Sequence, residues 1–130
     1  MADYVDDDYL GVDFSQTAIN YAREHTSNPR AMFVCGDALM VTVFDKLAFD
    51  TVLLLEVLEH VNLFAPFVTL AQQMARRRIV ITVPRDMPGR AHVHPRWEQR
   101  DIERLFGKLS VCRLFGGPEE DRWWLAVKDA

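Results

Sequence analysis

Three ionisable residues stand close together in the run Glu56-Val57-Leu58-Glu59-His60, directly after a long apolar stretch. Carboxylates and imidazoles are the side chains that most often move protons in enzymes. Glu56 and His60 are four residues apart, so on a helix they would share one face, with Glu59 beside them. We therefore expect this cluster to line a cofactor or substrate pocket; a plain helix-capping role at the surface is the alternative.

A second pair of imidazoles, His92 and His94, lies in the segment 85–96, which is expected to be a long loop. Alternate residues of an extended chain point the same way, so both rings could face one site. A histidine there is suited to act as a general base near neutral pH. Two solvent-facing loop histidines are the alternative. The candidate catalytic residues are thus Glu56, His60 and His94.

The elements that must position these residues alternate between apolar runs and amphipathic stretches. Strands are expected at 9–13, 32–35, 49–55, 78–83, 109–115 and 122–127, and helices after the N-cap Ser15, at 63–75 and at 97–106. Strands separated by helices pair in parallel, whereas the last two should form an antiparallel hairpin. We predict one α/β domain over residues 1–130.

Composition narrows the class of protein. Hydrophobic residues make up 49% of the chain, charged residues 26%, and the formal net charge is −4. No apolar run approaches the roughly 20 residues of a membrane helix, and the acidic start is unlike a secretory signal. We therefore expect a cytoplasmic protein with no membrane partner, for which nucleic acid is an unfavoured ligand. Cys35 and Cys112 are expected in the core, and Asp6-Asp7-Asp8 in a solvated tail.

Several of these segments together resemble one family. They are Tyr9 to Ser15, Cys35 to Ala38, Phe49 to Val61, Arg78 to Pro84 and the closing hairpin. They are similar to strands two to five and the inverted last pair of class I S-adenosylmethionine-dependent methyltransferases, of the type 11/23-like kind. The most specific match is Phe49 to Val61 with its Glu-Val-Leu-Glu-His run. The resemblance implies a Rossmann-like sheet, mostly parallel, with a C-terminal antiparallel hairpin.

The resemblance also implies a cofactor site for S-adenosylmethionine. Asp13, at the end of its strand, matches the acid that binds the ribose hydroxyls, and Phe14 would lie against the adenine face. Asp37, followed by Ala38, matches the acid that approaches the adenine amino group. Glu56 would lie on the reaction side. The methyl acceptor is unknown, and a small molecule is favoured.

The sequence departs from the family at its first strand, which normally ends in a glycine-rich turn. None of the six glycines forms a Gly-x-Gly turn between a strand and a helix. The chain is therefore expected to be a fragment or a reduced domain. Loss of that central strand should let Tyr9–Asp13 pair directly with Phe49–Leu55, or leave a gap. Unpaired strand edges favour association, so a homodimer is expected.

A different resemblance concerns metal. Small-RNA 3′-end methyltransferases carry a similar Glu-x-x-Glu-His run that, with a downstream histidine, holds a divalent ion. By this resemblance Glu56, Glu59, His60 and His92 (or His94) would bind manganese, iron or zinc. Many relatives with the same run bind no metal there, so no metal is the first expectation. Three functions remain open: a methyltransferase, a non-catalytic remnant acting as a binding or assembly module, and a metal-dependent RNA methyltransferase.

Overall fold

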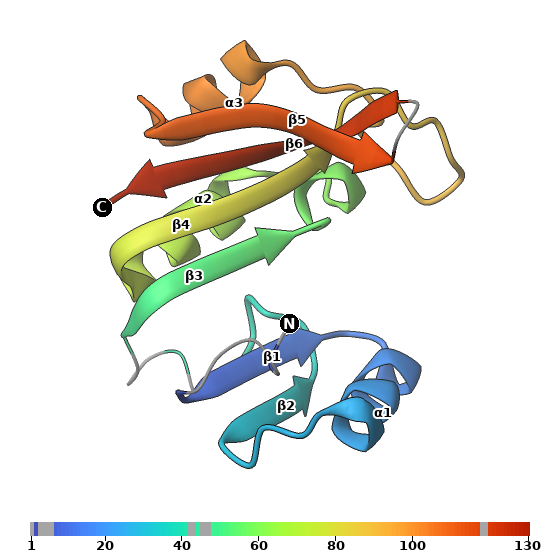
Figure 1. The fold of residues 1–130 in the computed structure, drawn as a ribbon, viewed down its shortest axis with the longest axis vertical. Helices are drawn as coiled ribbons and strands as arrows, with labels where there is room; N and C mark the ends of the chain where they lie inside the picture. Colours follow the sequence, from blue (N-terminus) through green and yellow to red (C-terminus); the bar gives the residue numbers. More distant parts are fainter. Residues whose placement is uncertain (1, 3–6, 42–43, 45–47, 118–119) are drawn as a thin grey trace. The chain divides into compact units, whose positions relative to one another are not determined.

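The computed structural model of the chain describes residues 2, 7–41, 44, 48–117 and 120–130. The chain divides into two compact units, Met1–Asp45 and Lys46–Ala130, called below the N-terminal and the C-terminal unit. Each unit has its own sheet (Figure 1). Among the described residues, no helix combines the length and the apolar character that crossing a membrane requires.

The N-terminal unit consists of two parallel strands joined by a helix. β1 (Tyr9–Asp13) leads through α1 (Gln16–His25) to β2 (Ala31–Cys35), and Gly11 lies opposite Phe33. The Ser15 hydroxyl accepts a hydrogen bond from the Ala18 amide at 3.2 Å, which confirms the predicted N-cap. The apolar side of α1 is anchored by Ile19, which is almost fully buried. The predicted strand–helix–strand order is therefore confirmed here.

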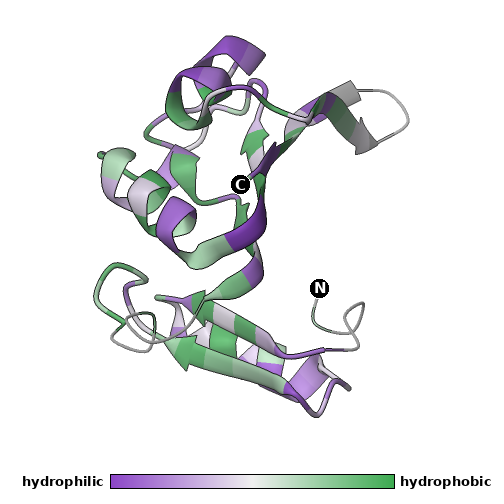
Figure 2. Ribbon diagram, turned by 90° about the vertical axis from the view of Figure 1, so that its left-hand side faces the viewer, coloured by the Kyte–Doolittle hydropathy of each residue, from purple (hydrophilic) through white to green (hydrophobic). Residues whose placement is uncertain are grey.

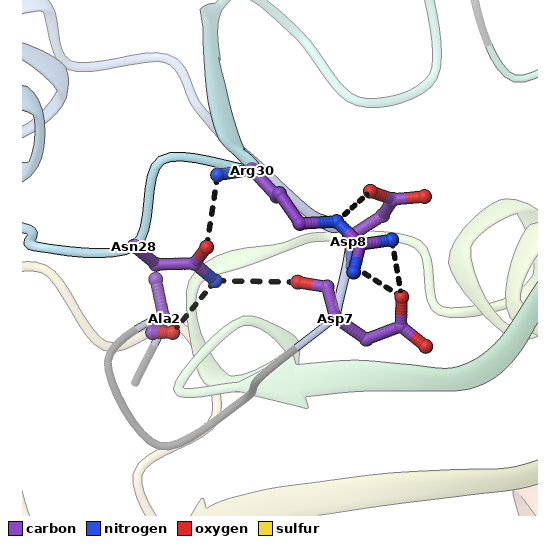
Figure 3. Close-up of polar contacts among 5 residues, drawn as sticks. All are labelled: Ala2, Asp7, Asp8, Asn28 and Arg30. Atoms are coloured by element: carbon purple, nitrogen blue, oxygen red, sulfur yellow. Dashed lines mark hydrogen bonds and ion pairs between the residues drawn. The ribbon is translucent and has the colours of Figure 1, made fainter.

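Polar contacts tie the start of the N-terminal unit to the loop before β2 (Figure 3). Arg30 pairs with Asp7 at 2.8 Å and with Asp8 at 2.9 Å. The Asn28 side-chain amide donates to the main-chain oxygens of Ala2 and Asp7. Asp7 and Asp8 are exposed, as a solvated tail requires, but they are ion-paired; the rest of the predicted acidic tail lies outside the described residues.

The C-terminal unit is a four-stranded mixed sheet with helices. Its elements are β3 (Phe49–Leu55), η3 (Leu58–His60), α2 (Ala65–Met74), β4 (Ala75–Pro84), α3 (Gln99–Phe106), β5 (Val111–Gly117) and β6 (Glu120–Asp129). The strand order is β3-β4-β6-β5, with β3 parallel to β4 and β6 antiparallel to both of its neighbours. This arrangement confirms the predicted Rossmann-like α/β class with a closing antiparallel hairpin.

The core of the C-terminal unit lies between the sheet and its two helices. In Figure 2, α2 and α3 lie on the same face of the sheet. Ile79, Ile81 and Val83, at alternate positions of β4, are 2% exposed or less and pack in one cluster with Leu58 and Ile102. Burying such side chains contributes about 2 kcal/mol each, which fixes the register of β4.

The helix α3 begins two residues later than the sequence pattern predicts. Glu98 is its N-cap and forms a reciprocal capping box with Asp101. Trp97 stands before the helix and is only 4% exposed, because its ring belongs to the core. Gly107 ends the helix with a φ of 78°, a conformation that glycine adopts without strain.

Two expectations about the fold are wrong. Of the two alternatives for Tyr9–Asp13, direct pairing with Phe49–Leu55 is wrong: among the described strands, β1 is bonded to β2 and β3 to β4, in separate sheets. The physical reason is connectivity, since the α1 crossover sets β2 beside β1, and no crossover joins β1 to β3. Cys35 is exposed, not in the core, because it is the last residue of β2.

Candidate functional site

Three potential ligand side chains gather in the C-terminal unit, and we call them the Glu59 cluster: Glu59, His60 and His92. One ligand atom from each lies within 4.8 Å of the others. Glu59 and His60 come from η3, directly after β3, and His92 comes from the loop between β4 and α3. The cluster therefore joins two segments that are more than 30 residues apart in the sequence.

A sharp turn after β3 sets the direction in which the chain enters η3. Glu56 has a φ of 54°, in the left-handed region that residues other than glycine rarely adopt. Its amide donates to both the main-chain oxygen and the hydroxyl of Thr82, at 3.3 and 3.1 Å, which holds the turn against β4. Leu58 is then fully buried in the core, and this burial fixes the short helix that carries Glu59 and His60.

Glu59 is the most unusual side chain of the cluster. It is 0% exposed, and neither carboxylate oxygen has a hydrogen-bond partner among the described residues. Burial raises the pKa of Glu59 to about 7, an effect that Glu56 reinforces and His60 opposes. Its main-chain oxygen accepts the amides of Val93 and His94 at 2.7 and 3.0 Å, which ties the loop to η3. Burial of an unpaired carboxylate is costly, so such a group is uncommon without a function.

The two imidazoles of the cluster are held in one tautomer. His60 Nδ1 lies 2.8 Å from the main-chain oxygen of Ala91, and His92 Nδ1 lies 2.6 Å from that of Met87. Because a carbonyl oxygen only accepts, each Nδ1 must donate, and each neutral ring keeps its lone pair on Nε2. The ring centroids are 4.9 Å apart, and His60 Nε2 is 3.9 Å from Glu59 Oε1. Both rings thus lie beside a buried carboxylate, each with Nδ1 held by a loop carbonyl.

Glu56 acts on Glu59, whose pKa it helps to raise, and its carboxylate has a further partner on β6. The expectation that Glu56 and His60 share a helical face is wrong, because the helix begins only at Leu58 and Glu56 lies in the preceding turn. The exposed Glu56 carboxylate accepts the indole N–H of Trp123 at 2.8 Å. The sequence gives no sign of this partner, which lies 67 residues away on β6.

His94 also lies apart from His92. Its ring packs on Phe64, with centroids 4.5 Å apart, and its Nε2 is buried without a hydrogen-bond partner among the described residues. Its main-chain oxygen accepts the indole N–H of Trp97 at 2.8 Å. The expectation that His92 and His94 face one site is therefore wrong, because the loop turns between them instead of running extended.

Four of the five predicted cofactor residues lie in the N-terminal unit, at the carboxyl ends of its strands, and the fifth, Glu56, lies in the C-terminal unit. Asp13 Oδ1 accepts the amide of Ser15 at 2.7 Å, and Asp37 Oδ1 accepts the amide of Leu39 at 2.9 Å. Both acids are exposed, Ala38 is half-buried, and the ring of Phe14 is 84% exposed. The Gly36 amide donates to the main-chain oxygen of Asp13 at 2.9 Å, so the two strand ends are joined.

The C-terminal unit also has an open surface pocket of about 700 Å³. Its lining residues are Arg85, Asp86, Arg96, Trp97, Glu98, Gln99, Arg100, Asp101 and Trp124. Ion pairs of 2.9 Å join Asp86 to Arg96 and Glu98 to Arg100, so charges of both signs surround the indole rings. Such a lining suits a small polar or zwitterionic molecule with an apolar part.

Known proteins share this sequence pattern and fold. The profile of the Methyltransferase domain family matches residues 1–79. Magnesium protoporphyrin IX methyltransferase from Synechocystis PCC 6803, with bound SAH, has a TM-score of 0.68 at 18% identity over 92% of this chain and 63% of that one. TehB from Haemophilus influenzae has a TM-score of 0.72 at 7% identity over 98% of this chain and 51% of that one.

A third solved structure, also of a methyltransferase, is similar to this chain. It is 1,6-didemethyltoxoflavin-N1-methyltransferase from Burkholderia thailandensis, with a TM-score of 0.70 at 14% identity over 92% of this chain and 60% of that one. The present chain thus spans less than two thirds of each of these structures. Comparison with curated protein sequences found no match.

Proposed function

This chain belongs to the class I S-adenosylmethionine-dependent methyltransferase family, and we propose that it binds S-adenosylmethionine through the strand ends of its N-terminal unit. The observation that carries this proposal is the pair Asp13 and Asp37, two exposed carboxylates at the joined ends of parallel strands. In open α/β sheets, ligands bind at the carboxyl ends of the strands.

Each proposed role uses an atom that the fold leaves available. Asp13 engages Ser15 through Oδ1, so Oδ2 can accept a hydrogen bond from the ribose diol. Asp37 engages Leu39 through Oδ1 and can use Oδ2 for the adenine amino group, beside Ala38. The exposed Phe14 ring offers a flat apolar face for adenine. Glu56 is a further candidate cofactor contact by the family resemblance.

The proposed reaction needs little covalent help from the protein. The sulfonium of S-adenosylmethionine is already activated, so alignment of a nucleophile with the methyl group supplies most of the rate. We propose a small molecule as methyl acceptor. His60, with an exposed edge and a free Nε2, is a candidate general base.

A second candidate function is a non-catalytic binding or assembly module. The observation that favours it is that none of the six glycines forms a Gly-x-Gly turn between a strand and a helix, the turn that in this family lets the main chain approach the cofactor. The free edge of β3, which pairs only with β4 among the described strands, favours a homodimer in either case. Sedimentation at micromolar concentration tests the dimer, and a monomer throughout would remove it.

Calorimetry and thermal shift with S-adenosylmethionine and S-adenosylhomocysteine separate the two functions. At a ligand concentration 1,000 times the dissociation constant, binding should stabilise the chain by about 4 kcal/mol. Asp13→Ala should abolish the shift, whereas Glu24→Ala, which removes an exposed carboxylate from α1, should leave it unchanged. No shift with either ligand would contradict cofactor binding and leave the binding module as the function.

A further inference from the structure

We propose that the surface pocket of the C-terminal unit binds a small carboxylate that carries a flat apolar body. The pocket has a volume of about 700 Å³, and its lining comes from the segment after β4, the start of α3 and Trp124 of β6. Ligand pockets measure roughly 300–1,000 Å³, so this volume suits a small organic molecule. The whole lining belongs to one unit, and binding here does not depend on the cofactor site of the N-terminal unit.

The charges of the lining leave one positive charge unmatched. Each of its three acids has an arginine partner: Asp86 with Arg96 and Glu98 with Arg100 at 2.9 Å, and Asp101 with Arg104 at 3.6 Å. Arg85 is different, because its exposed guanidinium has no hydrogen-bond or ion-pair partner among the described residues. A ligand with one negative charge would provide that partner.

The same charges favour a carboxylate over a phosphate. A guanidinium can bind either group through two parallel hydrogen bonds. A phosphate monoester, however, carries a charge of about −1.5 to −2 at neutral pH. The acids beside Arg85 would repel the additional negative charge, whereas a carboxylate brings a single charge that Arg85 balances.

The apolar part of the lining is aromatic. Trp124 is half-buried and Trp97 is only 4% exposed, so the Trp124 ring is the main apolar surface that a ligand can reach. Flat rings pack on an indole with a gain of about 0.5–1.5 kcal/mol beyond the burial of their area. A ligand with a planar apolar body therefore suits the pocket better than an aliphatic one.

Main-chain hydrogen bonds hold the parts of the pocket in place before any ligand binds. The Trp97 amide donates to the main-chain oxygen of Arg85 at 3.0 Å, and the Trp124 indole donates to the main-chain oxygen of Trp97 at 2.8 Å. Asp86 and Arg96 add an antiparallel bridge beside them. Because this frame is fixed, binding has to order little more than the Arg85 side chain, which lowers its entropic cost.

A solvated arginine beside an open groove is the competing explanation. It predicts no saturable binding, and it predicts no difference between a charged ligand and its neutral counterpart. The two explanations therefore differ in the affinity for a matched pair of probes, 2-naphthoate and 2-naphthamide, which share a flat body and differ in charge.

The test is an NMR titration of the isotope-labelled chain with sodium 2-naphthoate, without S-adenosylmethionine, followed by the indole N–H signals. Trp97 and Trp124 line the pocket, whereas the Trp123 indole donates to Glu56 and is the internal control. We expect the first two signals to move saturably, with a dissociation constant of about 1 mM or tighter, while the Trp123 signal stays in place. Binding of 2-naphthamide should be weaker by roughly tenfold or more, because it lacks the charge-assisted hydrogen bonds.

Arg85→Gln and Arg90→Gln are a matched pair of variants. Arg90 is an exposed arginine of the same loop that lies outside the lining. Arg85→Gln should weaken 2-naphthoate binding by roughly tenfold or more, and Arg90→Gln by less than about twofold. Both substitutions are at exposed positions, and the spectrum itself verifies that each variant is folded.

Four results would overturn the proposal. They are the absence of a saturable shift, an equal shift of the Trp123 signal, equal affinity for 2-naphthamide, and equal affinities in Arg85→Gln and Arg90→Gln. The comparison with 2-naphthamide needs no variant, so it decides the question even if a substitution disturbs the fold. Inorganic phosphate at the same concentration should not displace 2-naphthoate, and equal competition would overturn the assignment to a carboxylate.

Discussion

The buried carboxylate of Glu59 predicts an unusual pH dependence of the stability of the chain. Its pKa rises from 4.5 to about 7 on folding, mainly through burial. The folded state therefore holds the proton more tightly than the unfolded state. The stabilisation is complete below about pH 4.5 and is lost as the pH rises through 7. Since one pKa unit corresponds to about 1.4 kcal/mol, ionisation of Glu59 should lower the free energy of unfolding by about 3 kcal/mol.

Urea denaturation at pH 5 and pH 8 measures this loss. All the tryptophans of the chain, Trp97, Trp123 and Trp124, are in the C-terminal unit, so their fluorescence reports its unfolding. Glu59→Gln cannot ionise and should flatten the pH profile. Glu56, His60 and His92 also face this carboxylate or lie beside it, and they are present in both proteins, so the difference between the two profiles isolates Glu59.

Two results would refute the reasoning. Equal pH slopes in the parent and in Glu59→Gln would show that the buried carboxylate does not carry the effect. A parent chain whose stability relative to that of Glu59→Gln is greater at pH 8 than at pH 5 would give the wrong sign.

Three further predictions concern packing and capping. Gly11→Ala places a methyl group 2.8 Å from the ring of Phe33 and should destabilise the N-terminal unit by about 1–3 kcal/mol, measured by hydrogen exchange of the β1 and β2 amides. Ile81→Ala, at a fully buried position of β4, should cost about 2–5 kcal/mol in urea denaturation followed by tryptophan fluorescence. Ser15→Ala removes the cap that accepts the Ala18 amide and should cost about 1 kcal/mol, seen as faster exchange in the first turn of α1. Control variants at exposed positions should stay within 0.5 kcal/mol.

The sequence predicts those elements whose signals are local. The β-branched and leucine-rich runs of β3 and β4 mark buried strands, and the serine before α1 marks its first turn. The predicted first and last residues of an element are wrong where a tertiary contact determines them. Core packing of Trp97 delays the start of α3, and β4 begins at Ala75, ahead of three exposed arginines whose composition alone gives no strand.

The candidate site is predictable in its residue types and not in its geometry. The run Glu56 to His60 indicates polar chemistry, but its members do not share a helical face, because Glu56 lies in a left-handed turn before the short helix that carries Glu59 and His60. The orientation of His60 and His92 depends on two loop carbonyls. No local rule predicts which carbonyl a ring nitrogen will meet across a long loop, so the selection of His92 over His94 required the structure.

The two separate sheets have a consequence for cooperativity. Since no strand ladder joins them among the described residues, we expect that each unit can lose its hydrogen bonds separately, as a foldon of its own. The chain carries its own reporters: every tyrosine lies in Met1–Asp45 and every tryptophan in Lys46–Ala130. Ligands that bind one unit should therefore shift one spectroscopic transition alone. Two transitions that fail to coincide would make a single melting temperature an undefined quantity for this protein.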